Sequence, residues 1–233
     1  MKLYHYTKAE KFESIWKSQS LSFSVPKETN DLFERKKLMT VSCVEGNNRW
    51  IDLSVYSDII GGYKQVSFSQ DYEDGLRGCY SPMMWAHYGE NTGGICLEFD
   101  FDKLLKANRD IQSNMYHSQV VYTNELPVFE LCTSDLHNKD TIKRFIIKNI
   151  EGLFFIKHIH WKPENEYRFV SEKCDNLSIG NAVTAIYVPH EDCLAYRTVD
   201  KLVNGEVKIR VLIQSVLKGN RSISCYLPLK QWK

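Results

Sequence analysis

The sequence predicts an α+β fold, with short strands and helices mixed along a single domain of residues 1–233. Alternation of apolar and polar residues, as expected for strands, occurs in the segments 3–7, 21–25, 65–69 and 95–99. Apolar residues recur at helical spacing elsewhere, most extensively across 133–159. Because the sequence contains no internal repeat, linker or low-complexity tract, one α+β domain is the simplest account.

The beginning of the chain predicts a strand, a helix and a second strand. After the alternating residues 3–7, Thr7 and Glu10 have the spacing of a capping box in which Thr7 is the N-cap. Apolar residues at helical spacing follow, and residues 21–25 alternate again. Residues 29–34 then predict a turn that is rich in side-chain acceptors.

The middle of the chain predicts a helix at 52–60, a strand at 65–69 and a polar loop at 70–80 that is a candidate for mobility. Ser81 and Pro82 open the next helix as N-cap and first residue. The strand at 95–99 alternates in a way that predicts one buried face. Shorter elements are expected at 101–107 (helix) and near 119–122 (strand).

The last part of the chain predicts one long helix and several strands. Residues 133–159 have the longest helical pattern, and strands are expected at 182–188, 207–213 and 223–227. No functional motif is recognisable after residue 172, so we expect this region to complete the sheet.

Composition is typical of an ordinary globular protein, with 43% hydrophobic and 25% charged residues. A net charge of +1 argues against a broad electrostatic surface for nucleic acid. The seven cysteines form no CxxC pair, so neither zinc nor a redox pair is indicated. No secretory leader or membrane-spanning apolar run is recognisable, and we therefore expect a cytoplasmic protein without a membrane partner.

Residues 161–170 contain the most informative motif, two glutamates separated by one residue. Pro163 favours a turn, and the aromatic residues after the motif favour a strand. Since residues i and i+2 share a face of a strand, Glu164 and Glu166 should project together at the edge of a sheet. Two such charges raise the pKa of at least one carboxyl, which suits acid–base chemistry. A solvated strand edge explains the same pattern without a function.

Three polar residues on predicted strands are candidates for ligand binding. His5 ends the first strand beside a helix N-terminus, a place that suits an anion or a ribose, and Tyr4 and Tyr6 would wall this site. Ser67 and Ser69 place two hydroxyls on one strand face, where they could orient a neighbouring carboxylate. A structural histidine and ordinary strand alternation are the alternatives.

Aromatic residues before a glycine turn suggest a pocket for a flat ring. Trp85 and Tyr88 are three residues apart on a predicted helix and therefore share a face. Packing of both rings in the core is the alternative. His158 and His160 form only an HxH pair without a third ligand, so we expect no metal site.

Three ordered segments together resemble a widespread bacterial family that is catalogued as a domain of unknown function. The resemblance covers roughly residues 3–170 and supplies no established activity. The segments that carry it are Tyr4 to Thr7 with Asn30 to Glu34, Phe68 and Ser69 with Met84 to Tyr88 and Gly94 to Phe99, and Trp161 to Arg168.

A second resemblance, to ADP-ribosyltransferases of the DNA-thymidine toxin type, starts from the first segment. These enzymes have an Arg or His on the first strand, a Ser-x-Ser or a Tyr in the middle, and a late glutamate, often in ExE. This chain has His5, then Ser67 to Ser69 or Tyr88, then Glu164 to Glu166, in the same order. The resemblance implies an ADP-ribosyltransferase-like split β-sheet core with flanking helices.

The same resemblance implies a role for each matching residue. His5, beside Thr7, would hold the ribose hydroxyls of NAD, and Tyr6 or Tyr88 would stack on nicotinamide. Ser67 and Ser69 would brace the glutamate. Glu166 would stabilise the oxocarbenium-like state as nicotinamide leaves, and Glu164 would orient or deprotonate the acceptor. The middle motif is ambiguous between the Ser-x-Ser and Tyr types.

Three functions remain open from the sequence. The first is an NAD-dependent ADP-ribosyltransferase, as a toxin or phage-defence effector, that acts on a protein or nucleic acid acceptor. The second is a non-catalytic module that binds a nucleotide or protein. The third is a metal-dependent hydrolase or nuclease that uses Glu164 and Glu166. The sequence does not indicate the acceptor or the oligomeric state.

Overall fold

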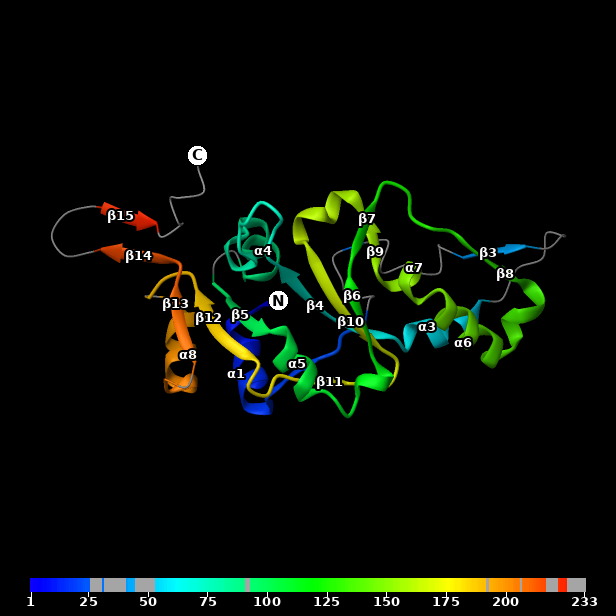
Figure 1. Cartoon of the computed structure of the whole chain (residues 1–233), viewed down its shortest axis with the longest axis horizontal. Coiled ribbons are helices and arrows are strands. Elements are labelled where there is room, and N and C mark those ends of the chain that lie inside the picture. Colours follow the sequence, from blue (N-terminus) through cyan, green and yellow to red (C-terminus); the bar gives the residue numbers. More distant parts are fainter. Residues whose placement is uncertain are drawn as a thin grey trace.

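A computed structural model describes residues 1–25, 31, 41–44, 53–90, 93–191, 193–205, 207–216 and 222–225. Its centre is a seven-stranded sheet in the order β13–β12–β5–β1–β4–β10–β6 (Figure 1). The strands are β1 Lys2–Thr7, β4 Lys64–Gln70, β5 Ile95–Asp100, β6 Tyr116–Gln119, β10 Glu166–Ser171, β12 Val183–Val188 and β13 Lys208–Val211. Neighbouring strands are antiparallel, except for the parallel pair β12 and β13. The predicted α+β class is confirmed.

The central sheet forks between β1 and β4. Strand β1 pairs with β5 from Lys2 to Thr7, but it pairs with β4 only at Leu3 and Tyr4. Beyond Tyr4 the two strands separate, while β4 continues to pair with β10 along its length. The split β-sheet core that we expected is therefore present as this fork between β1 and β4. His5 is the first β1 residue beyond the fork.

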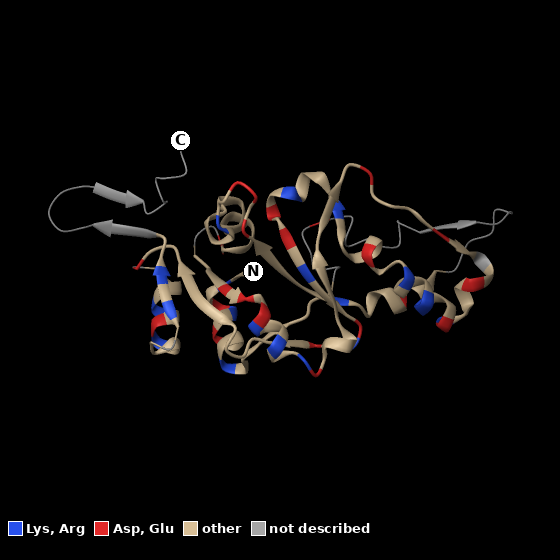
Figure 2. Ribbon diagram, viewed as in Figure 1, with Lys and Arg blue, Asp and Glu red and all other residues tan. Residues whose placement is uncertain are grey.

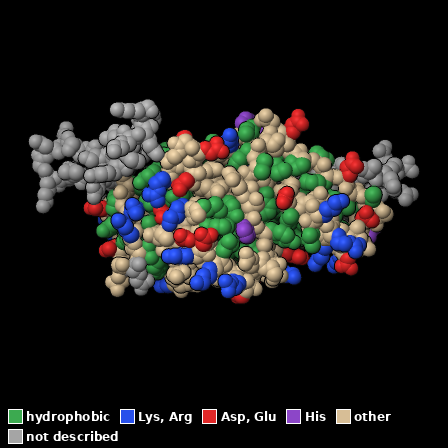
Figure 3. All heavy atoms as spheres, in the orientation of Figure 1, with side chains coloured by type: hydrophobic (Ala, Val, Ile, Leu, Met, Phe, Trp, Pro, Cys, Tyr) green, Lys and Arg blue, Asp and Glu red, His purple; other side chains and the backbone are tan. Residues whose placement is uncertain are grey.

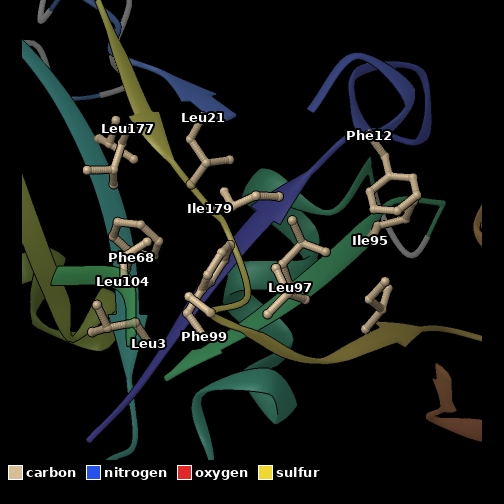
Figure 4. Packing of buried hydrophobic residues seen from close by; sticks show 14 of the residues in the cluster. Leu3, Phe12, Leu21, Phe68, Ile95, Leu97, Phe99, Leu104, Leu177 and Ile179 are labelled. Carbon is tan, nitrogen blue, oxygen red and sulfur yellow. The ribbon is translucent and has the colours of Figure 1, made fainter. Parts of the chain in front are cut away.

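One face of the sheet is covered by three helices and a small second sheet. The helices are α1 Ala9–Ser18, α5 Phe101–Ala107 and α8 Leu194–Val203, and β2 Ser20–Ser22 pairs with β11 Asn176–Ser178. Side chains from all of these layers meet in the largest hydrophobic cluster. Figure 4 shows Phe12, Phe68, Phe99 and Leu177 converging there from four different elements.

The opposite face is covered by α4 Pro82–Tyr88 and the short 3-10 helix η3 Gly78–Tyr80. They contribute Trp85 and Cys79 to a cluster that includes Tyr4, Tyr6 and Tyr187 of the sheet. Ser81 caps α4 by accepting a hydrogen bond from the Met84 N–H, as the sequence predicted. This face also carries the glutamate motif.

A third hydrophobic cluster lies beside the sheet and extends to the right in Figure 1. Its helices are α3 Ser54–Gly61, η6 Thr133–His137, α6 Lys139–Lys148 and α7 Ile150–Phe154. Val170 of β10 belongs to this cluster, and therefore links it to the sheet. The remaining elements are β3 Val41–Val44 with β8 Phe129–Cys132, β7 Val121–Thr123 with β9 Ile156–His158, β14 Ile213–Val216 with β15 Ser222–Cys225, η5 Gln112–Asn114 and η7 Ile159–Glu164.

Two predictions about helices were wrong. Thr7 is not a cap, because it is the last residue of β1 and Lys8 occupies the N-cap of α1 without a side-chain hydrogen bond. The long helix expected at 133–159 is broken into η6, α6, α7 and strand β9. Asn138 starts α6 by accepting two backbone N–H bonds, and Asn149 interrupts the helical run. Short polar residues favour such boundaries.

Predictions about strands were also wrong in part. Strand β5 has two buried faces, since Cys96 and Glu98 are as inaccessible as their apolar neighbours. The strand expected at 21–25 is limited to β2, followed by a single bridge between Ser24 and Gln65. Residues 207–213 divide between β13 and β14, and the region after 172 contains α8 as well as strands.

The polar loop after β4 is anchored at several points. Gly78 N–H bonds to the Asp71 carboxylate, and the Tyr72 hydroxyl donates to the Pro163 carbonyl at 2.6 Å. Of the acceptor-rich turn predicted at 29–34, only Asp31 lies within the described residues, and it is buried. Within the described residues, no helix is long and apolar enough to cross a membrane. Acidic and basic side chains are interspersed on the face shown in Figure 3.

Candidate functional site

The two glutamates of the motif converge although only one of them lies on a strand. Glu164 is the last residue of η7, Asn165 adopts a left-handed conformation with φ 45°, and Glu166 is the first residue of β10. Asparagine tolerates this conformation better than most residues. Asn165 is held by the loop after β4, through its carbonyl to Gln70 N–H and its side chain to the Asp71 carbonyl. The prediction that both glutamates lie on one strand is therefore corrected.

Lys157 of β9 connects the two carboxylates. Its Nζ lies 2.6 Å from Glu164 Oε2 and 3.3 Å from Glu166 Oε2. The side chain is only 5% exposed, and its ammonium group lies 5.0 Å from the centroid of the Trp161 ring. A cation is therefore buried between two buried acids, whose residues are 3% and 4% exposed. Figure 2 shows the acidic and basic positions where η7 meets β10.

Glu166 is held in its charged form. Arg168, which is buried on the same strand, donates from Nε to Oε1 and from Nη2 to Oε2, each at 2.7 Å. Ser67 of β4 contributes a further side-chain hydrogen bond. Burial opposes ionisation, but Arg168 and Lys157 outweigh it and lower the pKa of Glu166 to about 2. Ser67, one of the two serines that we predicted to brace the glutamate, therefore lies beside Glu166, and its bracing role stays a prediction.

Glu164 has the opposite shift. Tyr88 at the end of α4 donates from its hydroxyl to Glu164 Oε1 at 2.6 Å. Burial raises the pKa of Glu164, and the negative charge of Glu166 adds to this effect. Lys157 and the Tyr88 hydrogen bond only partly compensate. The expected raised pKa therefore falls on Glu164, while Glu166 stays ionised.

Cross-strand register places Ser69 between two buried acids on this face. Ser69 pairs with Glu166 on one side and with Tyr4 on the other, and Tyr4 pairs with Glu98. Ser69 is completely buried, and its hydroxyl acts on the neighbouring Tyr72 hydroxyl, where it opposes the rise of the Tyr72 pKa that burial causes.

A second charged cluster surrounds Glu98 and was not predicted. Glu98 accepts hydrogen bonds from Thr184 and Tyr187, each at 2.7 Å, and forms ion pairs with Arg77 and Lys2. Burial opposes ionisation of Glu98, but these partners lower the pKa below its ordinary value. Arg77 belongs to the loop after β4, so the cluster also anchors that loop over the sheet.

The N-terminal candidates lie apart from the glutamates. His5 Nδ1 donates to the Ser67 carbonyl at 3.0 Å, and the His5 ring packs against Phe68, on the opposite side of β4 from the Ser67 and Ser69 side chains. Burial lowers the pKa of His5. Tyr6 is buried, and its hydroxyl donates to the Gly78 carbonyl. Strand alternation therefore separates His5 from Tyr6, so Tyr4 and Tyr6 do not wall a site around it.

Thr7 and Trp85 are also parts of the packed structure. Thr7 is buried where β1 pairs with Ile95. Trp85 is buried, packs edge-on against Tyr6, and donates from Nε1 to the Cys79 carbonyl at 2.8 Å. The expected slot between Trp85 and Tyr88 is therefore absent, because only Tyr88 turns toward the glutamates.

Metal ligands do not gather in this region. His158 and His160 pack edge-to-face with ring centroids 4.5 Å apart. The described part of the chain contains no group of three or more His, Cys, Asp or Glu residues arranged for a metal ion. Between Glu164 and Glu166, the ammonium group of Lys157 supplies the positive charge that a shared metal would provide.

Lys157 and Arg168 are the site residues that sequence reasoning did not assign. Lys157 directly follows three apolar residues, Phe154 to Ile156, which is a signal for a buried cation that needs an acidic partner. Arg168 follows Glu166 by two residues in the sequence. Only the strand register shows that its side chain faces Glu166 rather than solvent.

A family model described as "Protein of unknown function (DUF2971)" matches residues 84–169. The matched segment includes Tyr88, Lys157, both glutamates and Arg168. The expected resemblance to a family of unknown function is thus confirmed over these residues, and the N-terminal segment that we included lies outside them. No curated protein matches the chain.

Among solved structures, the chain is similar to Thermus sp. 2.9 DarT in complex with ADP-ribosylated ssDNA. The match covers 90% of this chain and 93% of that chain, with 12% sequence identity and a TM-score of 0.38.

Proposed function

We propose that this protein is an NAD-dependent ADP-ribosyltransferase whose reaction takes place at Glu164 and Glu166. The observation that carries the proposal is the contact between side chains of the middle motif, Ser67 and Tyr88, and the two glutamates of the late motif. Ser67 hydrogen-bonds to Glu166 and Tyr88 hydrogen-bonds to Glu164, so each version of the ambiguous middle motif reaches one glutamate. The charge states suit the two roles, since Glu166 is a fixed anion and Glu164 titrates closer to neutral pH.

In the proposed reaction, the bond between nicotinamide and the ribose carbon breaks, and nicotinamide leaves with the electron pair. Glu166 stabilises the positive charge that develops on the ribose. A nucleophilic atom of the acceptor then bonds to that carbon, and its proton passes to ionised Glu164. Tyr88, which is half-buried and bonds to Glu164, is an aromatic residue placed to contact nicotinamide.

Tyr88 and Ser67 are half-buried, so they would form the accessible part of the site. The acceptor would be a protein or a nucleic acid of the cytoplasm, which would make the protein a toxin or phage-defence effector.

A second candidate function is a non-catalytic binding module. It is favoured because other side chains already fill the hydrogen-bond acceptor positions of the Glu166 carboxylate. A carboxylate has about four acceptor positions. Arg168 fills two of them, and Lys157 and Ser67 also bond to this carboxylate. Glu166 would then be a structural anion, and the ligand would contact Tyr88 and Glu164 without being cleaved.

The test is incubation of the purified protein with radiolabelled NAD, alone and with a cell lysate. Nicotinamide release or label transfer that is lost in Glu164→Gln and Glu166→Gln supports the transferase. The matched control is Glu13→Gln, the same change at an exposed pair with Lys17. Digestion of the labelled lysate with nuclease or protease identifies the acceptor class.

Two outcomes separate the candidates. NAD that binds in calorimetry but is not cleaved, with or without lysate, supports the binding module. NAD that neither binds nor reacts contradicts the proposed function. Expression in bacterial cells gives an independent measurement, because a toxin should arrest growth in the wild-type form and not in the Glu164→Gln form.

A further inference from the structure

Lys157 joins the two carboxylates of the buried charge cluster through one side chain. It donates to Glu164 Oε2 at 2.6 Å and to Glu166 Oε2 at 3.3 Å. Strand β9, which carries Lys157, pairs with β7 and not with β10. Lys157 therefore reaches the glutamates from outside the strand that carries Glu166.

The surroundings of Glu164 leave few other groups to control its charge. Tyr88 of α4 hydrogen-bonds to Oε1, and Glu166 of β10 repels it. Tyr72 after β4 and Tyr122 of β7 also lie within electrostatic range, and burial raises the pKa of both phenols. Arg168 is committed to Glu166. Lys157 is thus the cation that acts directly on Glu164.

We propose that Lys157 is a positioning residue that holds Glu164 and Glu166 side by side and sets which of them carries a proton. Without its ammonium group, two buried carboxylates would face each other, and among the described residues Arg168 would be the cation left to balance them. Burial and the like charge would then keep Glu164 protonated, and it could not accept a proton from an acceptor. The direction of this effect agrees with the way in which Lys157 opposes the raised pKa of Glu164.

The direct test follows the glutamate side-chain carboxyl carbons by 13C-detected NMR during a pH titration. The Glu164 signal is assigned by its loss in Glu164→Gln. In Lys157→Met the titration midpoint of Glu164 should move to higher pH, whereas Lys157→Arg should keep it near the wild-type position. The matched control is Lys64→Met, since Lys64 pairs with Asp175 and not with a glutamate of the cluster. An unchanged midpoint in Lys157→Met overturns the proposal.

A second measurement applies if Lys157→Met does not fold. In the wild-type protein, the 15N signal of the Lys157 ammonium group should shift with the same midpoint as the Glu164 carboxyl carbon. Independent titration of the two signals contradicts the proposal.

The catalytic consequence rests on the proposed function, but the NMR midpoints do not. If NAD is cleaved, the acidic limb of the kcat/KM profile should move to higher pH in Lys157→Met and be restored in Lys157→Arg. If NAD is not cleaved, the proposed function fails while the two NMR titrations still decide the role of Lys157.

Discussion

Glu164 and Glu166 are two residues apart and share Lys157, yet their pKa values shift in opposite directions. The difference comes from Arg168, which bonds to both oxygens of Glu166 and to neither oxygen of Glu164. Burial raises the pKa of both carboxyls, so the nearby cation decides whether the pKa finally lies above or below its ordinary value. At the scale of single residues, one arginine therefore divides a symmetrical motif into a permanent anion and a titratable acid.

Substitution of Glu166 should destabilise the protein strongly. Glu166→Gln leaves Arg168 buried without its anion, and loss of one partner of a buried pair costs roughly 3 to 5 kcal/mol. Urea unfolding at neutral pH measures the change. Glu13→Gln, at an exposed pair, should remain close to the wild-type protein. If the two variants unfold at the same urea concentration, the Arg168 pair is not stabilising.

The pH dependence of stability should contain opposite contributions from the two glutamates. The pKa of Glu166 is lowered from 4.5 to about 2, so its contribution is present above pH 4.5 and is lost as the pH falls from 4.5 toward 2. The folded-state pKa of Glu164 is raised above 4.5, so its contribution is present below that pH and is lost as the pH rises through the raised value.

Unfolding free energies measured from pH 3 to 8 test whether the two glutamates change the stability in these opposite directions. The difference between wild type and Glu164→Gln should change in favour of the variant as the pH rises above 4.5, since only the wild type then has to ionise a buried carboxyl. For Glu166→Gln, the disadvantage relative to wild type should shrink as the pH falls below 4.5. A pH-independent difference for either variant contradicts its assigned shift.

At the scale of elements, the loop after β4 connects the glutamate cluster with the Glu98 cluster. Tyr72 bonds to the turn before Glu164, and Arg77 pairs with Glu98. Gly78 lets this loop lie directly on the sheet, because a Cβ atom there would come within 2.4 Å of the Tyr4 ring and 2.7 Å of the Gln70 carbonyl. Both neighbours are part of the sheet and have little room to move.

Gly78→Ala should therefore destabilise the protein, by roughly 1 to 3 kcal/mol as for other overpacked sites. Gly61→Ala is the matched control, because its Cβ would meet nothing within 4 Å at the end of helix α3. That change should be neutral or stabilising by up to about 1 kcal/mol. Thermal unfolding of both variants decides the point, and equal midpoints would mean that the loop does not press on Tyr4.

At the scale of the whole molecule, the strands and the helical cluster beside them share contacts through β10. Val170 packs with α3, α6 and α7, and Arg168 Nη1 donates to the Phe154 carbonyl at 2.5 Å. The buried charge cluster thus lies where two hydrophobic clusters meet. We propose that residues 1–233 act as a single cooperative domain.

Truncation of one core residue in each cluster tests this proposal. Leu97→Ala and Ile146→Ala, both at fully buried positions, should each cost about 2 to 5 kcal/mol. In a single domain, each variant lowers the midpoint of one common transition, followed by tryptophan fluorescence and by far-ultraviolet circular dichroism. Two separate transitions, with only one shifted by each variant, would show that the clusters unfold independently.

The sequence by itself determined the features that depend only on residues close together along the chain. Alternation placed Ser67 and Ser69 together on one face of a strand, because side chains on any strand alternate between faces. Ser81 and Pro82 marked the start of α4 for equally local reasons. These patterns were sufficient for the α+β class and for the segments that contain the glutamate site.

Only the tertiary structure decided which segments meet. The two buried faces of β5 follow from its position inside the sheet, and no pattern within residues 95–99 records that position. Tyr88 reaches Glu164 across 76 positions of sequence, and the pairing of β1 with β4 puts His5 on the face of the sheet opposite the Glu166 side chain. Burial and the nearest cation then set the charge of each glutamate, because electrostatic energies depend on distance and solvent access in the folded state.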